Sequence, residues 1–219
     1  MMRFLKEYVP QVLLIVFSVV LGLFLSEKIK ERQDKQMAQQ LVSHLKTEIE
    51  QCRETMLEWM PYHEVLKHKL DSLRVDDSFI KEFENDPSAI FEVAPRGFFN
   101  GKVTSVAWET ALLNPAISEI SYHQLRDFKN VYNQLDITFF NSDISPMIKI
   151  MDLFTNVDFN APGKSKQNLQ AFSMSTQELI GREIDVIIYC NRALGDTLAE
   201  PYVVINQQLE ERKKSQKNK

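Results

Sequence analysis

An uninterrupted apolar run near the N-terminus most constrains how this chain can fold. Residues 8–25 read YVPQVLLIVFSVVLGLFL, and only Ser18 and Gly22 separate the large apolar side chains after Gln11. A helix of this length spans about 27 Å, close to the roughly 30 Å hydrocarbon core of a bilayer. The run predicts a transmembrane helix that faces lipid with Val12, Leu13, Leu14, Ile15, Val16, Phe17, Val19, Val20, Leu21, Leu23, Phe24 and Leu25.

Two other interpretations of the run compete with an anchor, namely a cleaved signal peptide and a buried helix of a soluble protein. Signal-peptide cleavage needs small residues at the −3 and −1 positions. The pair Phe24 and Ser26 near the end of the run does not meet this requirement. A buried soluble helix is not expected at the extreme N-terminus without a polar face. We therefore expect an uncleaved, single-pass anchor that binds the lipid bilayer.

The side of the membrane that holds the remaining chain is only weakly indicated. Basic residues flank the run on both sides, and they are Arg3 and Lys6 before it and Lys28, Lys30, Arg32 and Lys35 after it. Only lysine and arginine count in the positive-inside rule, and with the amino terminus included the tally favours a cytoplasmic C-terminal side by one charge. A short basic tail ahead of an uncleaved span favours a domain outside the cytoplasm, and the orientation stays open at this point.

The composition after the run is that of one ordinary helical domain. The whole chain is 44% hydrophobic and 26% charged, and six glycines are too few for a fold with many tight β-turns. We predict an all-α protein in which the transmembrane helix continues into a stalk and then an antiparallel bundle. The predicted divisions are a tail at 1–7, the span at 8–25, a polar helical stalk at 26–40, the bundle at 41–209 and a basic disordered tail at 210–219.

A heptad pattern runs along the first long helix of the bundle. Its members, which we call the seam, are Leu45, Ile49, Cys52, Met56, Trp59, His63, Leu66, Leu70 and Leu73. Steps of four and three residues over four heptads are typical of helices that pack along their length. Pro61 would clash with the carbonyl group of Leu57, so we expect a kink or short break near Met60. The candidate interaction residues are Leu45, Ile49, Met56, Trp59, Leu66 and Leu70.

Shorter elements are predicted between two long helices. Residues 75–102 lose the helical period and contain turn signals, so we expect a loop folded over the core with its phenylalanines Phe79, Phe83, Phe91, Phe98 and Phe99. Ser121 and Gln124 form a capping box that starts a helix. The predicted helices are 103–113, 121–140, 147–155 and the long 165–198, followed by an apolar piece at 202–209.

No motif in the chain predicts catalysis or a cofactor. Residues 160–165 end like a phosphate-binding loop, but Asp158 stands where that loop needs glycine. His63 and His68 are five residues apart, which places their rings roughly 140° apart on a helix and prevents them from sharing a metal. We expect no catalytic residues, no cofactor and no metal, and the net charge of −4 argues against nucleic-acid binding.

The two cysteines, Cys52 and Cys190, are too few for a zinc site or a disulfide scaffold. Each lies on the apolar face of a predicted long helix, so the two thiols could approach one another across an antiparallel pair. Buried free thiols are one interpretation. A disulfide is the other, and it requires a domain outside the cytoplasm.

The order of these features resembles a group of uncharacterised bacterial single-pass membrane proteins. The matching pieces are the apolar run at 12–25, the charged helix at 27–58, the stretch Ala107-Trp108-Glu109-Thr110 and the stripe from Leu125 to Tyr132. The resemblance implies a bacterial inner membrane and a helical domain, and it carries no activity. Trp108 is the site candidate in this stretch, with helix packing as the other role open to it.

These observations lead to one leading hypothesis and two rivals. We expect a non-enzymatic, membrane-anchored protein whose long helix binds another protein or a second copy of itself. The alternative is a sensor-like bundle that binds a ligand and acts through a partner, which a polar-lined pocket between the long helices would support. An enzyme would need a cleft with convergent carboxylates or histidines.

Overall fold

Helices make up all the secondary structure among the described residues, which confirms the predicted all-α class. The computed structural model describes the backbone of residues 2–86, 88–98, 101, 103–141, 143–156 and 164–196, with side chains from residue 11 onward except 154–156. The elements are α1 (Met2–Leu73), α2 (Asp77–Asn85), α3 (Ala89–Val93), α4 (Val106–Leu112), the 3₁₀ turn η1 (Pro115–Glu119), α5 (Tyr122–Leu135), the π-turn η2 (Asp136–Phe140), α6 (Pro146–Asn156) and α7 (Ser165–Leu194).

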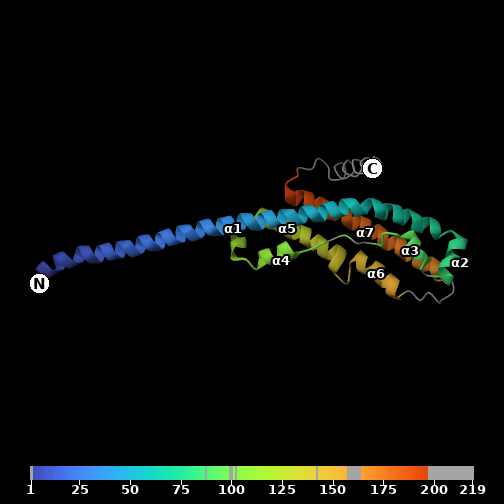
Figure 1. Cartoon of the computed structure of the whole chain (residues 1–219), viewed down its shortest axis with the longest axis horizontal. Coiled ribbons are helices and arrows are strands. Elements are labelled where there is room, and N and C mark those ends of the chain that lie inside the picture. Colours follow the sequence, from blue (N-terminus) through green and yellow to red (C-terminus); the bar gives the residue numbers. More distant parts are fainter. Residues whose placement is uncertain are drawn as a thin grey trace.

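Helix α1 joins the apolar run to the bundle without a break (Figure 1). Within the described residues it is the one helix that is long and apolar enough to cross a membrane. The side chains of the predicted span, Val12 to Leu25, are all exposed, and Ala38 is the first buried residue along the helix. The polar segment between them is therefore a helical stalk that separates the run from the packed domain.

The second long helix, α7, packs antiparallel against the distal half of α1 (Figure 1). Polar contacts show the opposite directions, since Asp71 meets Ser173 and His63 meets Glu183. The seam on α1 faces α7 and the core, and its buried members are Leu45, Ile49, Cys52, Met56, Trp59, His63, Leu66 and Leu70. These eight members therefore pack inside the chain's own bundle, and Leu73 at the end of the seam is partly exposed.

Helix α1 passes through Pro61 as continuous helix, so the break predicted near Met60 does not occur. Figure 1 shows α1 curving gradually in its distal half instead. Buried side chains on both sides of the proline, such as Met56 and Leu66, hold this part of α1 in the core. Tertiary packing therefore supports helical structure across a residue that removes one backbone hydrogen bond.

The segment predicted as a loop contains two short helices. Asp76 caps α2 by accepting hydrogen bonds from the backbone N–H groups of Ser78 and Phe79. Phe83 and Phe98 are buried, as expected of a segment folded over the core, whereas Phe91 is exposed. The loop prediction was wrong for α2 and α3 because their few turns are too short to establish a clear period in the sequence.

Helix α7 ends earlier than predicted. Gly195 has a φ of 85° and its N–H reaches the carbonyl groups of Asn191 and Arg192, which is the left-handed cap that terminates many helices. Among the other elements, Ser121 caps α5 as the capping box predicts, and α4 starts at Val106 instead of residue 103. The predicted apolar piece at 202–209 and the basic tail at 210–219 lie outside the described residues.

Candidate binding groove

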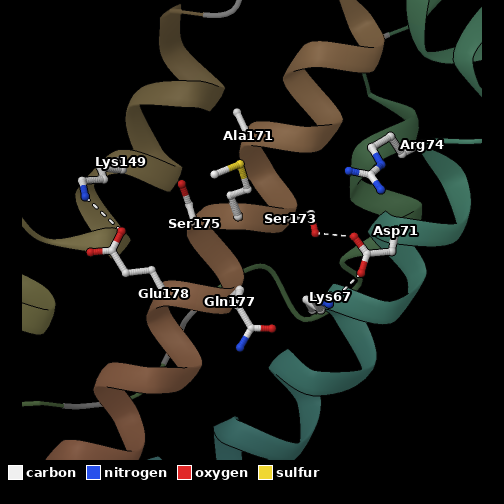
Figure 2. Close-up of a pocket in the computed structure, with 10 residues that line it drawn as sticks. Lys67, Asp71, Arg74, Lys149, Ala171, Ser173, Ser175, Gln177 and Glu178 are labelled. Atoms are coloured by element: carbon white, nitrogen blue, oxygen red, sulfur yellow. Dashed lines mark hydrogen bonds and ion pairs between the residues drawn. The ribbon is translucent and has the colours of Figure 1, made fainter.

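An open groove lies at the end of the bundle far from the N-terminus, with α7 as its floor and α1 and α6 on either side (Figure 2). Its volume is about 850 Å³. The residues that line it are Lys67, Asp71 and Arg74 from α1 and the turn after it, Lys149 from α6, and Ala171, Ser173, Met174, Ser175, Gln177 and Glu178 from α7.

Helical spacing explains why these side chains share one groove. Lys67, Asp71 and Arg74 are separated by four and three residues, which places them on one face of α1 and its final turn. On α7, Ala171, Ser175 and Glu178 follow the same rule. Two aligned helical faces therefore present a row of polar and charged groups to the same space.

Asp71 connects the two long helices at the wall of the groove. Lys67 Nζ lies 2.7 Å from one carboxylate oxygen, and Ser173 Oγ donates a 2.6 Å hydrogen bond to the other (Figure 2). The hydrogen bonds from Lys67 and then Ser173 lower the pKa of Asp71 below its usual value. Asp71 therefore stays ionised at neutral pH and keeps α1 and α7 in register.

The opposite wall is joined by an ion pair between α6 and α7. Lys149 Nζ lies 3.0 Å from Glu178 Oε2, and both side chains remain partly exposed (Figure 2). Exposed pairs of this kind contribute roughly 0.2–1 kcal/mol. A bound group that offers its own charge can therefore exchange with either member of the pair at little cost.

Arg74 differs from the two lysines of the groove, because Lys67 and Lys149 each pair with a carboxylate. Its guanidinium group forms no ion pair with any residue that the structure describes, although its charge helps to lower the pKa of Asp71. Three cations and two carboxylates line the groove, so its net charge is positive. A planar guanidinium with five N–H donors suits a carboxylate or phosphate group.

A second groove of about 530 Å³ lies beside another face of the same end of α1. Val65, Leu73, Phe79 and Val93 give it apolar walls, and His68, Lys69, Ser72 and Glu92 complete its lining. It is formed by α1, α2 and α3. The distal end of α1 therefore carries two different hollows, one charged and one mainly apolar.

In the core between α1 and α7, His63 and Glu183 form a polar pair. His63 Nδ1 lies 2.9 and 3.0 Å from the two carboxylate oxygens, its Nε2 faces the carbonyl oxygen of Phe98, and both side chains are fully buried. Because Nε2 donates to the carbonyl group, a single proton is shared between Nδ1 and Glu183. Burial raises the pKa of Glu183, and the hydrogen bond from His63 opposes this effect.

This pair is a structural element and has no access to a substrate, since neither residue reaches solvent. The sequence places His63 in the heptad seam, and the structure confirms that this position is buried. Glu183 was not identified from the sequence. A charged residue among the apolar positions of α7 was the available signal, because carboxylates are rarely buried without a partner.

The stretch with Trp108 is organised around Glu48. The carboxylate accepts hydrogen bonds from Tyr132 Oη at 2.7 Å, Thr104 Oγ1 at 2.7 Å and the backbone N–H of Ala107 at 3.1 Å. Trp108 stacks on Tyr132 with ring centroids 5.2 Å apart. Trp108 is therefore part of the packing between α4 and α5. The hydrogen bonds of Glu48 connect both helices to α1.

Cys52 and Cys190 are free thiols buried on the facing sides of α1 and α7. Burial raises the pKa of Cys52 to about 11 and also raises the pKa of Cys190. Thiols that stay protonated at neutral pH are poor nucleophiles. The two cysteines therefore act as small apolar side chains in this structure.

Within the described residues, no group of three or more histidine, cysteine, aspartate or glutamate side chains could hold a metal ion. Comparison of the chain with protein-family models, with curated proteins and with solved structures gives no match. We take the charged groove in Figure 2 as the candidate functional site because two helical walls converge on it with ionised side chains.

Proposed function

We propose that this protein is a non-enzymatic, single-pass membrane protein that binds a partner protein in the groove of Figure 2. The observation that carries the proposal is the position of the groove on a continuous helix. From Leu25 to Lys67, α1 rises about 63 Å at 1.5 Å per residue. The stalk and bundle thus act as a spacer that presents the groove well away from the membrane.

The shape of the groove favours a protein segment over a small molecule. Small-molecule pockets enclose most of their ligand, whereas this groove is open and its charged walls are solvent-exposed. Arg74 would pair with an acidic side chain of the partner. Met174, which is 64% exposed, would provide an adaptable apolar contact beside it.

The sequence suggested the seam of α1 as the binding face, but the seam's candidate interaction residues are buried. We therefore propose a different face of this helix for binding. Leu45, Ile49, Met56, Trp59, Leu66 and Leu70 are occupied by the chain's own core. A second copy or another protein could use them only if α7 left α1. We therefore propose that the partner contacts α1 through its groove face, at Lys67, Asp71 and the adjoining Arg74.

A second candidate function is a sensor-like bundle that binds a small anionic ligand and acts through a partner. The observation in its favour is that the groove is lined by polar side chains from both long helices, including Lys67 and Ser173. Such a ligand would join α1 and α7, and α1 would carry any change in their packing along the stalk.

The resemblance described above supports placing the anchor in a bacterial inner membrane, and the short basic N-terminal tail supports a domain outside the cytoplasm. Two reporters fused after Lys219 in separate full-length chains test this orientation. One is active only in the cytoplasm and the other only outside it. Activity of the cytoplasmic reporter alone would reverse the proposed orientation.

Site-specific photo-crosslinking in the native membrane tests the binding proposal. A photoreactive amino acid replaces Met174 in the groove of the full-length chain, and in a matched control it replaces Gln51 on the exposed face of α1. We expect an adduct of higher mass only from position 174. Reversal of charge in Arg74→Glu should reduce its yield about tenfold or more.

Each outcome of this experiment distinguishes one occupant from another. An adduct of twice the chain's mass identifies a second copy in the groove. The same adducts from position 51 and position 174, or none from position 174, would overturn the proposal. Binding of a small anion to the purified chain without any protein adduct would favour the sensor-like candidate.

A further inference from the structure

A second surface lies at the other end of the bundle, the end closest to the apolar run. Three large side chains are exposed at this end, and they are Leu112, Leu113 and Tyr122. Val106, at the start of the same helix α4, is exposed as well. We call Leu112, Leu113 and Tyr122 the proximal edge. Leu113 is 87% exposed and Tyr122 is 73% exposed, which is a high exposure for large apolar side chains in a packed domain.

The helices explain why these side chains are left without a covering element. The inward face of α4 is used by Ala107, Trp108 and Ala111, which pack against the core. Leu112 and Leu113 fall at the end of α4, where the chain turns at Pro115 into η1. Tyr122 begins α5 on the far side of that turn. The proximal edge is therefore the tip of a connection that the bundle does not cover.

The level of the proximal edge along α1 is set by the connection between α4 and α5. Lys35 and Ala38 of α1 line a hollow together with Glu119, Ile120 and Gln124. This connection therefore sits beside the first packed turns of α1, and Figure 1 shows it at the bundle end nearest the N-terminal part of α1.

The length of α1 between the apolar run and this connection sets the distance of the proximal edge from the bilayer. From Leu25, the end of the apolar run, the helix rises about 15 Å to Lys35 and about 26 Å to Val42, the first and last residues of α1 that line this hollow. The interfacial layer beyond the hydrocarbon core takes up roughly 5–8 Å of this rise. Transmembrane helices tilt by about 20° on average, and a tilt toward α4 lowers this side of the domain toward the head groups.

The chemistry of the proximal edge suits a lipid surface. Tyrosine is enriched at membrane interfaces, where its ring lies among head groups and its hydroxyl group stays hydrated. Leucine side chains gain free energy by entering the acyl boundary. Lys30 and Arg32 lie exposed on the stalk between the run and the edge, and they attract anionic lipid to the same place.

We propose that Leu112, Leu113 and Tyr122 rest on the lipid surface, so that the bundle leans on the bilayer at its proximal edge. This inference rests on the membrane anchor of the proposed function and adds a second, peripheral contact to it. The membrane anchor belongs to the same chain, so it keeps the proximal edge close to lipid at all times. A second copy of the protein would first have to diffuse to the proximal edge. A bundle held against the bilayer in this way would present the groove of Figure 2 in a fixed direction relative to the membrane.

Depth-dependent fluorescence quenching in vesicles tests the inference on the full-length chain. An environment-sensitive dye is attached to Leu113→Cys in a Cys52→Ala, Cys190→Ala background, and the protein is reconstituted into vesicles of phosphatidylethanolamine and phosphatidylglycerol. The lipids carry a spin-label quencher near the head group. Val20→Cys in the span and Val75→Cys, an exposed aliphatic position after α1, are the matched positions.

We expect quenching at positions 113 and 20 and none at position 75. Addition of Leu112→Asp and Tyr122→Asp should remove most of the quenching at position 113 and leave position 20 unchanged. Circular dichroism checks that each variant keeps its helical content. All of these substitutions lie at exposed positions apart from the two cysteines, and the Cys52→Ala, Cys190→Ala chain without an added cysteine measures dye that binds without a thiol.

The outcomes separate this inference from the anchor on which it rests. Quenching at position 20 alone would overturn the lipid contact and leave the anchor in place. No quenching at any position would overturn the anchor as well. A blue-shifted dye at position 113 that the lipid quencher does not reach would identify a protein surface as the occupant and would also overturn the inference.

Discussion

His63 and Glu183 form a fully buried pair between the two long helices, with His63 Nδ1 2.9 Å from the nearer carboxylate oxygen. One shared proton leaves the pair electrically neutral, so the core holds two titratable groups without a net charge. A slide of one helical turn, about 5.4 Å, would separate them. The pair therefore fixes the register of α7 against α1 and, with it, the alignment of the groove walls.

Loss of the histidine should cost far more stability than a conservative change of the glutamate. His63→Ala leaves Glu183 buried without its partner, and we expect a loss of about 3–5 kcal/mol. Glu183→Gln can still donate to Nδ1 while Nε2 donates to the carbonyl group of Phe98, so its cost should be about 1 kcal/mol. Urea unfolding of the detergent-solubilised chain, followed by circular dichroism, measures both. Equal losses would contradict the neutral, proton-sharing pair.

Glu48 should control the local stability of α4. Glu48→Ala removes the acceptor for Tyr132, Thr104 and the N–H of Ala107, and we expect a cost of about 1–3 kcal/mol. Hydrogen exchange of residues 104–112 should increase before exchange in α7 does. Tyr132→Phe, which removes only one of the three donors, is the control and should have a smaller effect. Unchanged exchange in α4 would show that its packing does not depend on Glu48.

The hydrogen bonds to Asp71 predict a specific dependence of stability on pH. Lys67 and Ser173 lower the pKa of the folded carboxyl group, and the unfolded group titrates near 3.9. Its stabilisation is therefore present above the unfolded pKa and is lost as the pH falls through the lowered folded pKa. Wild type should exceed Asp71→Asn by less than about 1 kcal/mol at pH 7, because the side chain is partly exposed.

That difference should shrink as the pH falls below the unfolded pKa and disappear once the pH is below the lowered folded pKa of Asp71. Urea midpoints measured at several pH values for both chains check the convergence. Lys67→Met is the control, because removal of the first partner of Asp71 should shrink the same pH-dependent difference. A difference that grows as the pH falls would contradict the assigned sign.

The two thiols should be inert in the folded chain. Burial keeps Cys52 and Cys190 protonated, with the pKa of Cys52 at about 11, so alkylation by iodoacetamide near pH 8 should be slow. In urea both thiols should react, and mass spectrometry should record two additions. Electrophoretic mobility should not change with reductant. Rapid labelling of the folded chain, or a mass that fits a disulfide, would contradict buried free thiols.

Replacement of Pro61 should stabilise α1. Because the helix continues through this residue, Pro61→Ala restores an N–H group that can donate to the carbonyl group of Leu57. We expect a gain of about 1–3 kcal/mol, measured by the urea midpoint. Val65→Ala, another change on the exposed side of the same helix, is the control and should be nearly neutral. A loss of stability in Pro61→Ala would show that the proline ring itself is needed for packing.

Local features of the fold were predictable because they depend on neighbours in the sequence. The run at 12–25 follows from length and polarity, the start of α5 follows from the cap at Ser121, and the burial of the seam follows from its period. The candidate groove was not predictable. Lys67, Arg74 and Lys149 are ordinary surface residues in the sequence, and only the packing of α6 and α7 beside α1 brings them together.

The sequence by itself determined an all-helical chain with an apolar span, a polar stalk and a heptad seam, because these properties repeat along a single helix. The tertiary structure decided what covers the seam, namely α7 of the same chain, and carried α1 through Pro61. It also paired His63 with Glu183, 120 residues away. Such contacts depend on the free energy of packing distant segments, which no local pattern encodes.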